Sequence, residues 1–180
     1  MEIFYLLIDN EAMKSATVSV IGRPSSGKST LVNTICEMKV SITSATPQTT
    51  RNKIRGIYTD QRGQLVFTDT PGYHISDKTI NKRMQDVTIS ALKDSDLILY
   101  VLDGKRSAKT EEEMIANMIK ASRVPTVAVI NKSDILSENN IKEAKAFLSS
   151  VLPKVESFVA SAKNDEGIDE VLIALFKLAK

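Results

Sequence analysis

The amino-acid sequence predicts an α/β fold in which a mainly parallel, six-stranded sheet is covered by helices on both faces. From about residue 16, short runs rich in β-branched residues alternate with longer segments of helical pattern. Two runs, LILYVL at 97–102 and TVAVI at 126–130, are apolar throughout, which is typical of strands buried on both faces. The last segment has apolar residues at 168, 171, 172, 175, 176 and 179, and this spacing predicts a helix with one core-facing side.

Six strands are expected in order along the chain. The first, at 16–21, ends at a glycine. The next two, at 54–59 and 65–68, flank the segment DQRGQ, which predicts a hairpin and one antiparallel pair. The two apolar runs follow, and a weaker sixth strand is expected at 155–160.

Helices are expected in the intervals between the strands. One is predicted at 29–38, where apolar residues recur at helical spacing. Thr110 and Glu113 have the spacing of a capping box, which predicts the start of another helix. Residues 39–52 are rich in Ser, Thr and Pro and predict a long loop.

The composition excludes several classes of protein. The 180 residues are 42% hydrophobic and 26% charged, which suits one soluble globular domain. With 24 Lys and Arg against 22 Asp and Glu, the net charge of +2 gives no support for a dedicated nucleic-acid binder. One cysteine and one histidine exclude an internal disulfide and a Cys/His zinc site. No apolar run approaches the roughly 20 residues of a membrane span, and the short run at 3–8 lacks the basic lead of a signal peptide. We therefore expect a cytoplasmic monomer, with residues 1–14 as an N-terminal extension and 15–180 as the domain.

The segment GRPSSGKS at 22–29 carries the first chemical signal. It matches the pattern G-x-x-x-x-G-K-S directly after a predicted strand and at the start of a predicted helix. The glycines let successive backbone N–H groups converge on a phosphate, and the helix N-terminus adds its partial positive charge. Lys28 can then reach the β- and γ-phosphates, and the Ser29 hydroxyl can bind Mg²⁺.

Three further motifs follow predicted strands, at the edge of a parallel sheet where ligands bind. DTPG at 69–72 offers a carboxylate for Mg²⁺ and a glycine amide for a γ-phosphate. NKSD at 131–134 supplies Asp134, whose carboxylate can accept two hydrogen bonds from guanine but none of that kind from adenine. Hydrogen bonds to a charged group contribute about 1.5–3 kcal/mol each, so losing both would weaken adenine binding at least about a hundredfold. SAK at 161–163 closes the next strand.

The order GRPSSGKST, TTR, DTPG, NKSD and SAK resembles that of the translation-factor-related P-loop GTPases, which have a Ras-like G domain. More narrowly, SITSATPQTTRNKIRGI at 41–57 with DTPGYH at 69–74 is similar to the Era family of bacterial ribosome-assembly GTPases. Other members of the class, such as tandem-domain and tRNA-modifying GTPases, also carry TTR and DTPG. The resemblance extends over about residues 15–180.

The resemblance implies a Mg²⁺-dependent switch that binds GTP and GDP and hydrolyses GTP. It assigns Ser29, Thr50 and Asp69 to the metal, and Lys28, Thr50, Asp69 and Gly72 to catalysis. Residues 39–52 and about 72–82 are then the two switch segments. The positions that it assigns to the nucleotide are Gly22, Arg23, Pro24, Ser25, Ser26, Gly27, Lys28, Ser29, Thr30, Asp69, Thr70, Pro71, Gly72, Asn131, Lys132, Asp134, Ser161, Ala162 and Lys163.

Two positions depart from patterns found in related GTPases. Tyr73 follows the DTPG motif, where GTPases with strong intrinsic activity place a glutamine that orients the attacking water, so slow intrinsic hydrolysis is expected. Ser25 and Ser26 replace the Asn-Val of relatives, and that asparagine helps to bind K⁺ in potassium-activated members. Potassium activation is therefore not expected here.

The family also sets the expected partners. Era proteins continue into a KH domain that binds 16S ribosomal RNA, and such a domain needs a GXXG loop. No such tetrapeptide occurs in this chain, so we expect weak RNA binding or none, in an isolated G domain or a natural short form. In a longer protein the partners would be 16S rRNA and the 30S subunit, with peripheral membrane association left open. The alternatives are a GTPase with another client, such as tRNA modification, a nucleotide-dependent interaction module without hydrolysis, and a small-molecule phosphotransferase.

Overall fold

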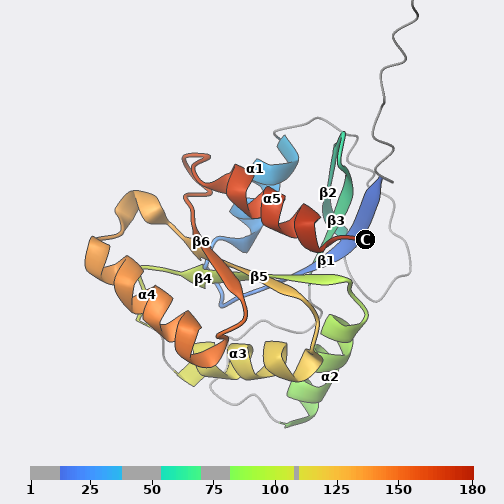
Figure 1. Ribbon diagram of the computed structural model, residues 1–180. Helices are drawn as coiled ribbons and strands as arrows, with labels where there is room; N and C mark the ends of the chain where they lie inside the picture. The colour runs from blue at the N-terminus through green and yellow to red at the C-terminus, as the bar shows by residue number, and fades with distance from the viewer. Residues whose placement is uncertain (1–12, 38–53, 70–81, 108–109) are drawn as a thin grey trace, which may run out of the picture.

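The structure is a computed structural model of the chain, and it describes residues 13–37, 54–69, 82–107 and 110–180 (Figure 1). The elements in chain order are β1 (Lys14–Ile21), α1 (Lys28–Glu37), β2 (Ile54–Asp60), β3 (Gly63–Asp69), α2 (Lys82–Lys93), β4 (Leu97–Asp103), α3 (Thr110–Ser122), β5 (Thr126–Asn131), a 3-10 turn at Ser133–Ile135, α4 (Glu138–Val151), β6 (Glu156–Val159) and α5 (Ile168–Leu178).

The sheet has six strands in the order β2-β3-β1-β4-β5-β6. All neighbouring pairs are parallel except β2 and β3, which form the predicted antiparallel hairpin. The predicted α/β class and the mainly parallel sheet are therefore confirmed. Because five strands run in one direction, their carboxyl ends lie along the same edge of the sheet.

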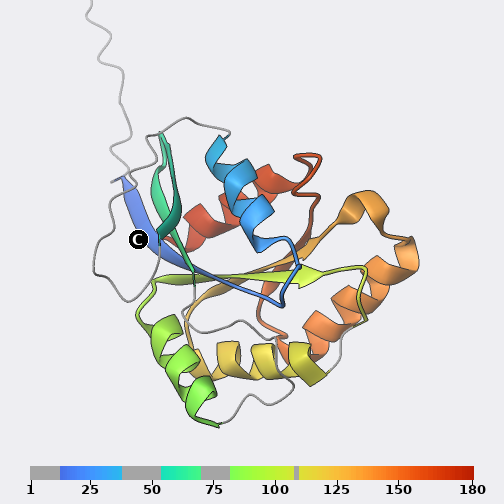
Figure 2. The ribbon, with the colours of Figure 1, turned by 180° about the vertical axis from the view of Figure 1, so that it is seen from behind.

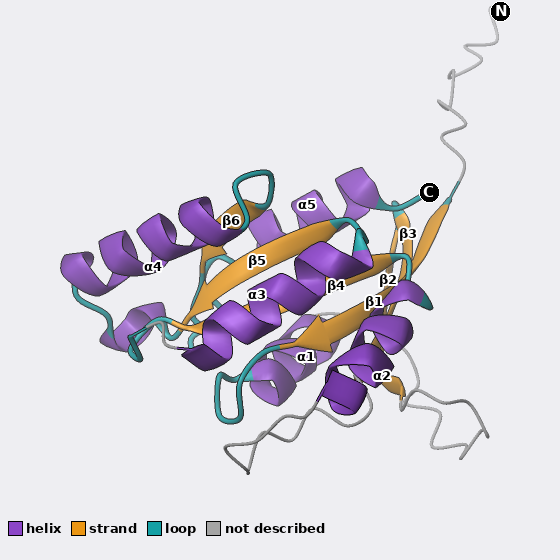
Figure 3. Cartoon of the chain, turned by 90° about the horizontal axis from the view of Figure 1, so that it is seen from below, coloured by secondary structure: helices purple, strands orange, loops and turns teal. Residues whose placement is uncertain are grey.

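Helices cover both faces of the sheet, as predicted. Helices α1 and α5 lie on one face, and α2, α3 and α4 lie on the other (Figures 1 and 2). Seen from below, α3 lies over β4 and β5 (Figure 3). Among the described residues, no helix combines the length and the apolar character that crossing a bilayer requires.

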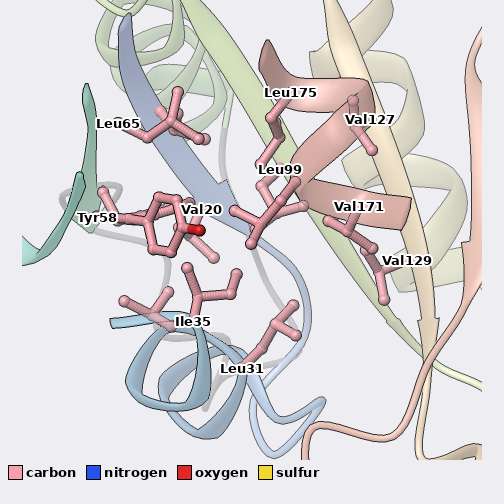
Figure 4. Packing of buried hydrophobic residues seen from close by; sticks show 14 of the residues in the cluster. Val20, Leu31, Ile35, Tyr58, Leu65, Leu99, Val127, Val129, Val171 and Leu175 are labelled. Carbon is pink, nitrogen blue, oxygen red and sulfur yellow. The ribbon is translucent and has the colours of Figure 1, made fainter. Parts of the chain in front are cut away.

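The strand β4 explains why its sequence is apolar at every position. Leu97, Leu99 and Val101 face the core beneath α1 and α5, while alternate residues face the core beneath α3 and α4. Figure 4 shows Leu99 between Leu31 of α1 and Leu175 of α5. A strand buried on both faces needs apolar side chains on both, which removes the usual alternation with polar residues.

The predicted start of the first strand needs correction. Strand β1 begins at Lys14, two residues before the predicted start, because the Lys14 amide donates to the Arg62 carbonyl at 3.0 Å. Helix α3 begins at Thr110, as the pattern of Thr110 and Glu113 predicted. A capping box that was not predicted begins α4, where the Ser137 hydroxyl accepts from the Asn140 amide at 3.2 Å and the Asn140 carboxamide accepts from the Ser137 amide.

Replacing Leu99 with alanine tests the importance of this core. Leu99 is fully buried, so Leu99→Ala is expected to lower the free energy of unfolding by about 3 kcal/mol through lost burial and the cavity left behind. Ile173, which is 58% exposed on α5, is the matched control, and Ile173→Ala should change the free energy of unfolding by less than about 0.5 kcal/mol. Urea unfolding followed by circular dichroism measures both, and equal effects would contradict the assignment of Leu99 to the core.

Candidate functional site

The predicted site residues lie in loops that follow parallel strands, so the sheet brings them to one edge. The segment 22–29 follows β1, Asn131 ends β5, and 161–163 follows β6. The register pairs Val20 with Asp69 and Asp103 with Asn131, which sets the strand ends level with one another. Residues 70–72 and Thr50, also predicted to belong to the site, lie outside the described residues.

The loop at 22–29 curls around its own lysine. The Lys28 ammonium donates to the carbonyls of Gly22 and Arg23, both at 2.8 Å. Gly27 has a φ of +93°, and a Cβ added there would lie 2.2 Å from the side-chain nitrogen Nδ2 of Asn131. Only glycine therefore fits both the backbone conformation and the close approach at this point of the loop.

Asn131 joins this loop to the loop after β6. Its side chain is buried, and its Nδ2 donates to the Ser26 carbonyl at 2.9 Å while its Oδ1 accepts from the Ala162 amide at 3.0 Å. Both ends of the carboxamide are therefore occupied by backbone groups, which fixes the distance between the two loops.

Asp134 and Ser161, two further predicted site residues, are in direct contact. The fully buried Ser161 hydroxyl donates to Asp134 Oδ1 at 2.8 Å and accepts from the Asn164 amide at 3.2 Å. The Ser161 hydroxyl orients the Asp134 carboxylate. Because Asp134 is exposed, the carboxylate is also accessible to a ligand.

Asp103, at the end of β4, belongs to this site but was missed by the sequence analysis. It is buried, and its Oδ2 accepts from the Lys132 ammonium at 2.8 Å. Lys132 has a left-handed backbone with φ +72°, which aims its side chain across the edge toward β4. The one sequence signal was an aspartate that ends an apolar strand run, in LILYVLDG.

Ser29, the second residue of α1, contacts an arginine that the sequence analysis did not place in the site. The Arg55 guanidinium, on β2, donates from Nη1 to Ser29 Oγ at 2.5 Å. The motif that contains Ser29 was recognised from local sequence, whereas this contact depends on how β2 packs against α1.

Behind the loop at 22–29, Arg23 connects to the first turn of α3. Its Nη2 lies 2.6 Å from Glu111 Oε2 and its Nε lies 3.8 Å from Glu112 Oε1. Glu112 is 1% exposed, and its other oxygen accepts from the Tyr100 hydroxyl. Burial raises the pKa of Glu112 to about 7, against the opposing effects of the Tyr100 hydrogen bond and of Arg23.

These loops and their sheet define a P-loop nucleotide-binding protein. A model of the family described as "50S ribosome-binding GTPase" matches residues 17–132, and the chain belongs to this family of GTPases.

Named relatives are more specific. The chain is 54% identical over 123 residues to "GTPase Era" of Borrelia duttonii, covering 68% of this chain and 42% of that protein. It is 44% identical over 168 residues to "GTPase Era" of Treponema denticola, covering 92% of this chain and 57% of that protein. The chain thus spans about half the length of the curated relatives it matches.

A solved structure shows the same likeness. The chain is similar to the crystal structure of Era in complex with MgGDPNP and nucleotides 1506–1542 of 16S ribosomal RNA, with a TM-score of 0.73 and 29% sequence identity. The match covers 94% of this chain and 58% of that one. The predicted Era resemblance and the Ras-like P-loop fold are therefore confirmed.

The buried carboxyl of Glu112 predicts a dependence of stability on pH. Its pKa is about 7 in the folded protein and 4.5 in its ordinary state, so the folded protein holds this proton more tightly. The resulting stabilisation is complete below the ordinary value and is lost as pH rises through about 7. Between about pH 5 and about pH 8, the free energy of unfolding should fall by roughly 2 kcal/mol relative to Glu112→Gln, which cannot titrate.

Urea unfolding of both proteins at matched pH values measures this difference. Subtracting the variant from the unmodified chain removes the contribution of every other titrating group. A difference that stays constant with pH would contradict the raised pKa of Glu112.

Proposed function

We propose that this chain binds GTP and GDP with Mg²⁺, hydrolyses GTP, and acts as a switch in assembly of the small ribosomal subunit. The observation that carries the proposal is the Asn131 carboxamide, which holds the loop at 22–29 and the loop at 161–163 at a fixed separation. One side of that arrangement is the loop at 22–29 with its lysine, Lys28. The other side presents the oriented carboxylate of Asp134.

Guanine recognition is assigned to Asp134, Lys132 and the loop at 161–163. The Ser161 hydrogen bond aims the Asp134 carboxylate, which then accepts from the N1–H and the exocyclic amine of guanine. The ion pair with Asp103 holds the Lys132 stem extended across the sheet edge, so its methylene groups can cover one face of a planar base. The backbone of Ser161, Ala162 and Lys163 is assigned to the base oxygen.

The phosphates and the metal are assigned to the loop at 22–29, Thr30 and the carboxyl end of β3. Lys28 exchanges its two carbonyl partners for phosphate oxygens, and the N-terminus of α1 faces them. Ser29 and Asp69 supply a hydroxyl and a carboxylate oxygen, the donors that Mg²⁺ prefers, so these residues fit the metal. Thr50, Thr70, Pro71 and Gly72 are assigned by the family pattern. The similar Era structure contains MgGDPNP, which supports the same assignment.

Hydrolysis requires little covalent chemistry from the protein, because phosphoryl transfer is catalysed mainly by positioning and by charge stabilisation. Lys28 and the loop amides hold the phosphates, while Asp69 and Gly72 are assigned to sensing the γ-phosphate. Tyr73 offers no carboxamide to orient water, so turnover by the chain alone is slow.

The proposed client is 16S rRNA and the 30S subunit, because the similar Era structure contains a 16S rRNA segment. The family model is described as a 50S ribosome-binding GTPase, whereas the named relatives are Era proteins. Binding to RNA is proposed for the longer protein and only weakly for this chain, and the location is proposed to be cytoplasmic.

Substitution of Asp134 tests guanine recognition. Asp134→Ala should weaken GDP binding at least about a hundredfold in isothermal titration, because two hydrogen bonds to a charged acceptor are lost. Glu143→Ala removes an exposed carboxylate that bonds Asn139 on α4, and it should leave GDP binding unchanged. An Asp134→Ala variant that unfolds at the same temperature and still binds GDP tightly would exclude this role.

Release of inorganic phosphate from GTP tests the enzymatic part and separates it from a non-hydrolysing interaction module. We expect slow release above the protein-free background, with equal rates in KCl and NaCl because Ser25 stands where potassium-activated relatives have asparagine. Lys28→Ala should reduce the rate to background, since the phosphates lose their cation. GDP binding without any phosphate release would favour the interaction module, and a large increase in KCl would overturn the role given to Ser25.

A further inference from the structure

Arg55 lies where β2 departs from regular pairing with β3. The register runs from Ile54 opposite Thr68 to Gly56 opposite Phe67, so the extra residue of this irregularity is Arg55. Bulges of this kind re-aim a side chain and occur beside functional sites.

Close packing of β2 on α1 brings Arg55 to the loop at 22–29. A Cβ added at Gly56 would lie 2.4 Å from Cys36 Sγ and 3.3 Å from Val32 Cγ1, so the absence of a side chain lets the strand approach the helix. From this position the Arg55 guanidinium donates to Ser29 Oγ at 2.5 Å. The contact joins a cation to the hydroxyl that the proposed function assigns to Mg²⁺.

Mg²⁺ binds its oxygen ligands at about 2.0–2.1 Å, so a guanidinium within hydrogen-bond distance of the same hydroxyl lies beside the metal position. Two positive groups at one hydroxyl repel each other, and the phosphates of a nucleotide attract both. A guanidinium can also bond phosphate oxygens through two parallel N–H groups.

We propose that Arg55 replaces Mg²⁺ at Ser29 when the metal is absent, bonding the β-phosphate of GDP so that GDP binding does not require the metal. This inference rests on the proposed function, since it presumes that GDP occupies this loop. In the metal-bound state Arg55 leaves Ser29, which makes the two cations alternatives at one hydroxyl.

The test compares GDP affinity in excess Mg²⁺ with that in EDTA, by isothermal titration of the unmodified 180-residue chain and of Arg55→Gln. The unmodified chain should lose no more than about tenfold in affinity on removal of Mg²⁺, whereas Arg55→Gln should lose at least about tenfold more than that. In excess Mg²⁺ the variant should bind GDP at least as tightly as the unmodified chain, because the competing cation is gone.

Two further variants keep the result interpretable. Arg123→Gln removes the same charge from an exposed position after α3 and should behave as the unmodified chain does. Arg55→Lys keeps the charge without the planar fork and should fall between the unmodified chain and Arg55→Gln. Equal unfolding temperatures establish that the variants are folded.

Each outcome decides one question. If the unmodified chain fails to bind GDP in Mg²⁺, the proposed function is wrong, and the inference fails with it. If it binds GDP but the ratio between EDTA and Mg²⁺ is the same with and without Arg55, the inference alone is overturned. An equal loss of affinity in both conditions on Arg55→Gln would also overturn it, because Arg55 would then act independently of the metal.

Discussion

The edge of the sheet that carries the candidate site depends on one buried carboxamide, that of Asn131. Asn131 ends the strand β5, where its side chain is buried and must find partners in the protein. Its amide and carbonyl bond the Ser26 carbonyl and the Ala162 amide, so two loops more than a hundred residues apart in sequence share a single anchor. The position of that anchor is set by the pairing of Asn131 with Asp103. Errors in strand register would therefore move the loop at 22–29 and the loop at 161–163 together.

Charged groups form a second layer behind this edge. Asp103 holds Lys132, and Glu112 with Glu111 holds Arg23, so acidic residues of β4 and α3 fix cations that belong to the loops. Burial of the charged Glu112 carboxylate is unfavourable by itself, which raises the pKa of this group. The Tyr100 hydroxyl and Arg23 offset part of that cost, which makes the position of the loop at 22–29 dependent on the start of α3.

Local sequence was sufficient for the strands and for the loops that carry motifs, because burial on both faces leaves an unbroken apolar run, as in β4 and β5. It missed the capping box of Ser137 and Asn140, because asparagine stands where the usual pattern has glutamate or glutamine. The contacts of Arg55, Asp103 and Arg23 could not be predicted, because each joins residues distant in sequence. Arg55 reaches Ser29 through a bulge and a glycine contact, neither of which leaves a periodic signal. Asn131 was expected to contact the nucleotide, and its role as a link between loops became visible only in three dimensions.

The carboxyl end of the described chain is fixed against the start of the first strand. The Ser15 amide donates to the Lys180 carbonyl at 2.8 Å, and the Lys14 ammonium donates to the Phe176 carbonyl at 3.1 Å, which places residue 180 beside the amino end of β1 (Figure 1). That end of β1 lies at the opposite edge of the sheet from the loop at 22–29. A fluorescent dye coupled beside residue 180 would therefore stand clear of a nucleotide in the loops. Its separation from a labelled nucleotide would span the sheet from edge to edge, and energy transfer between the two dyes would measure the length of the domain directly.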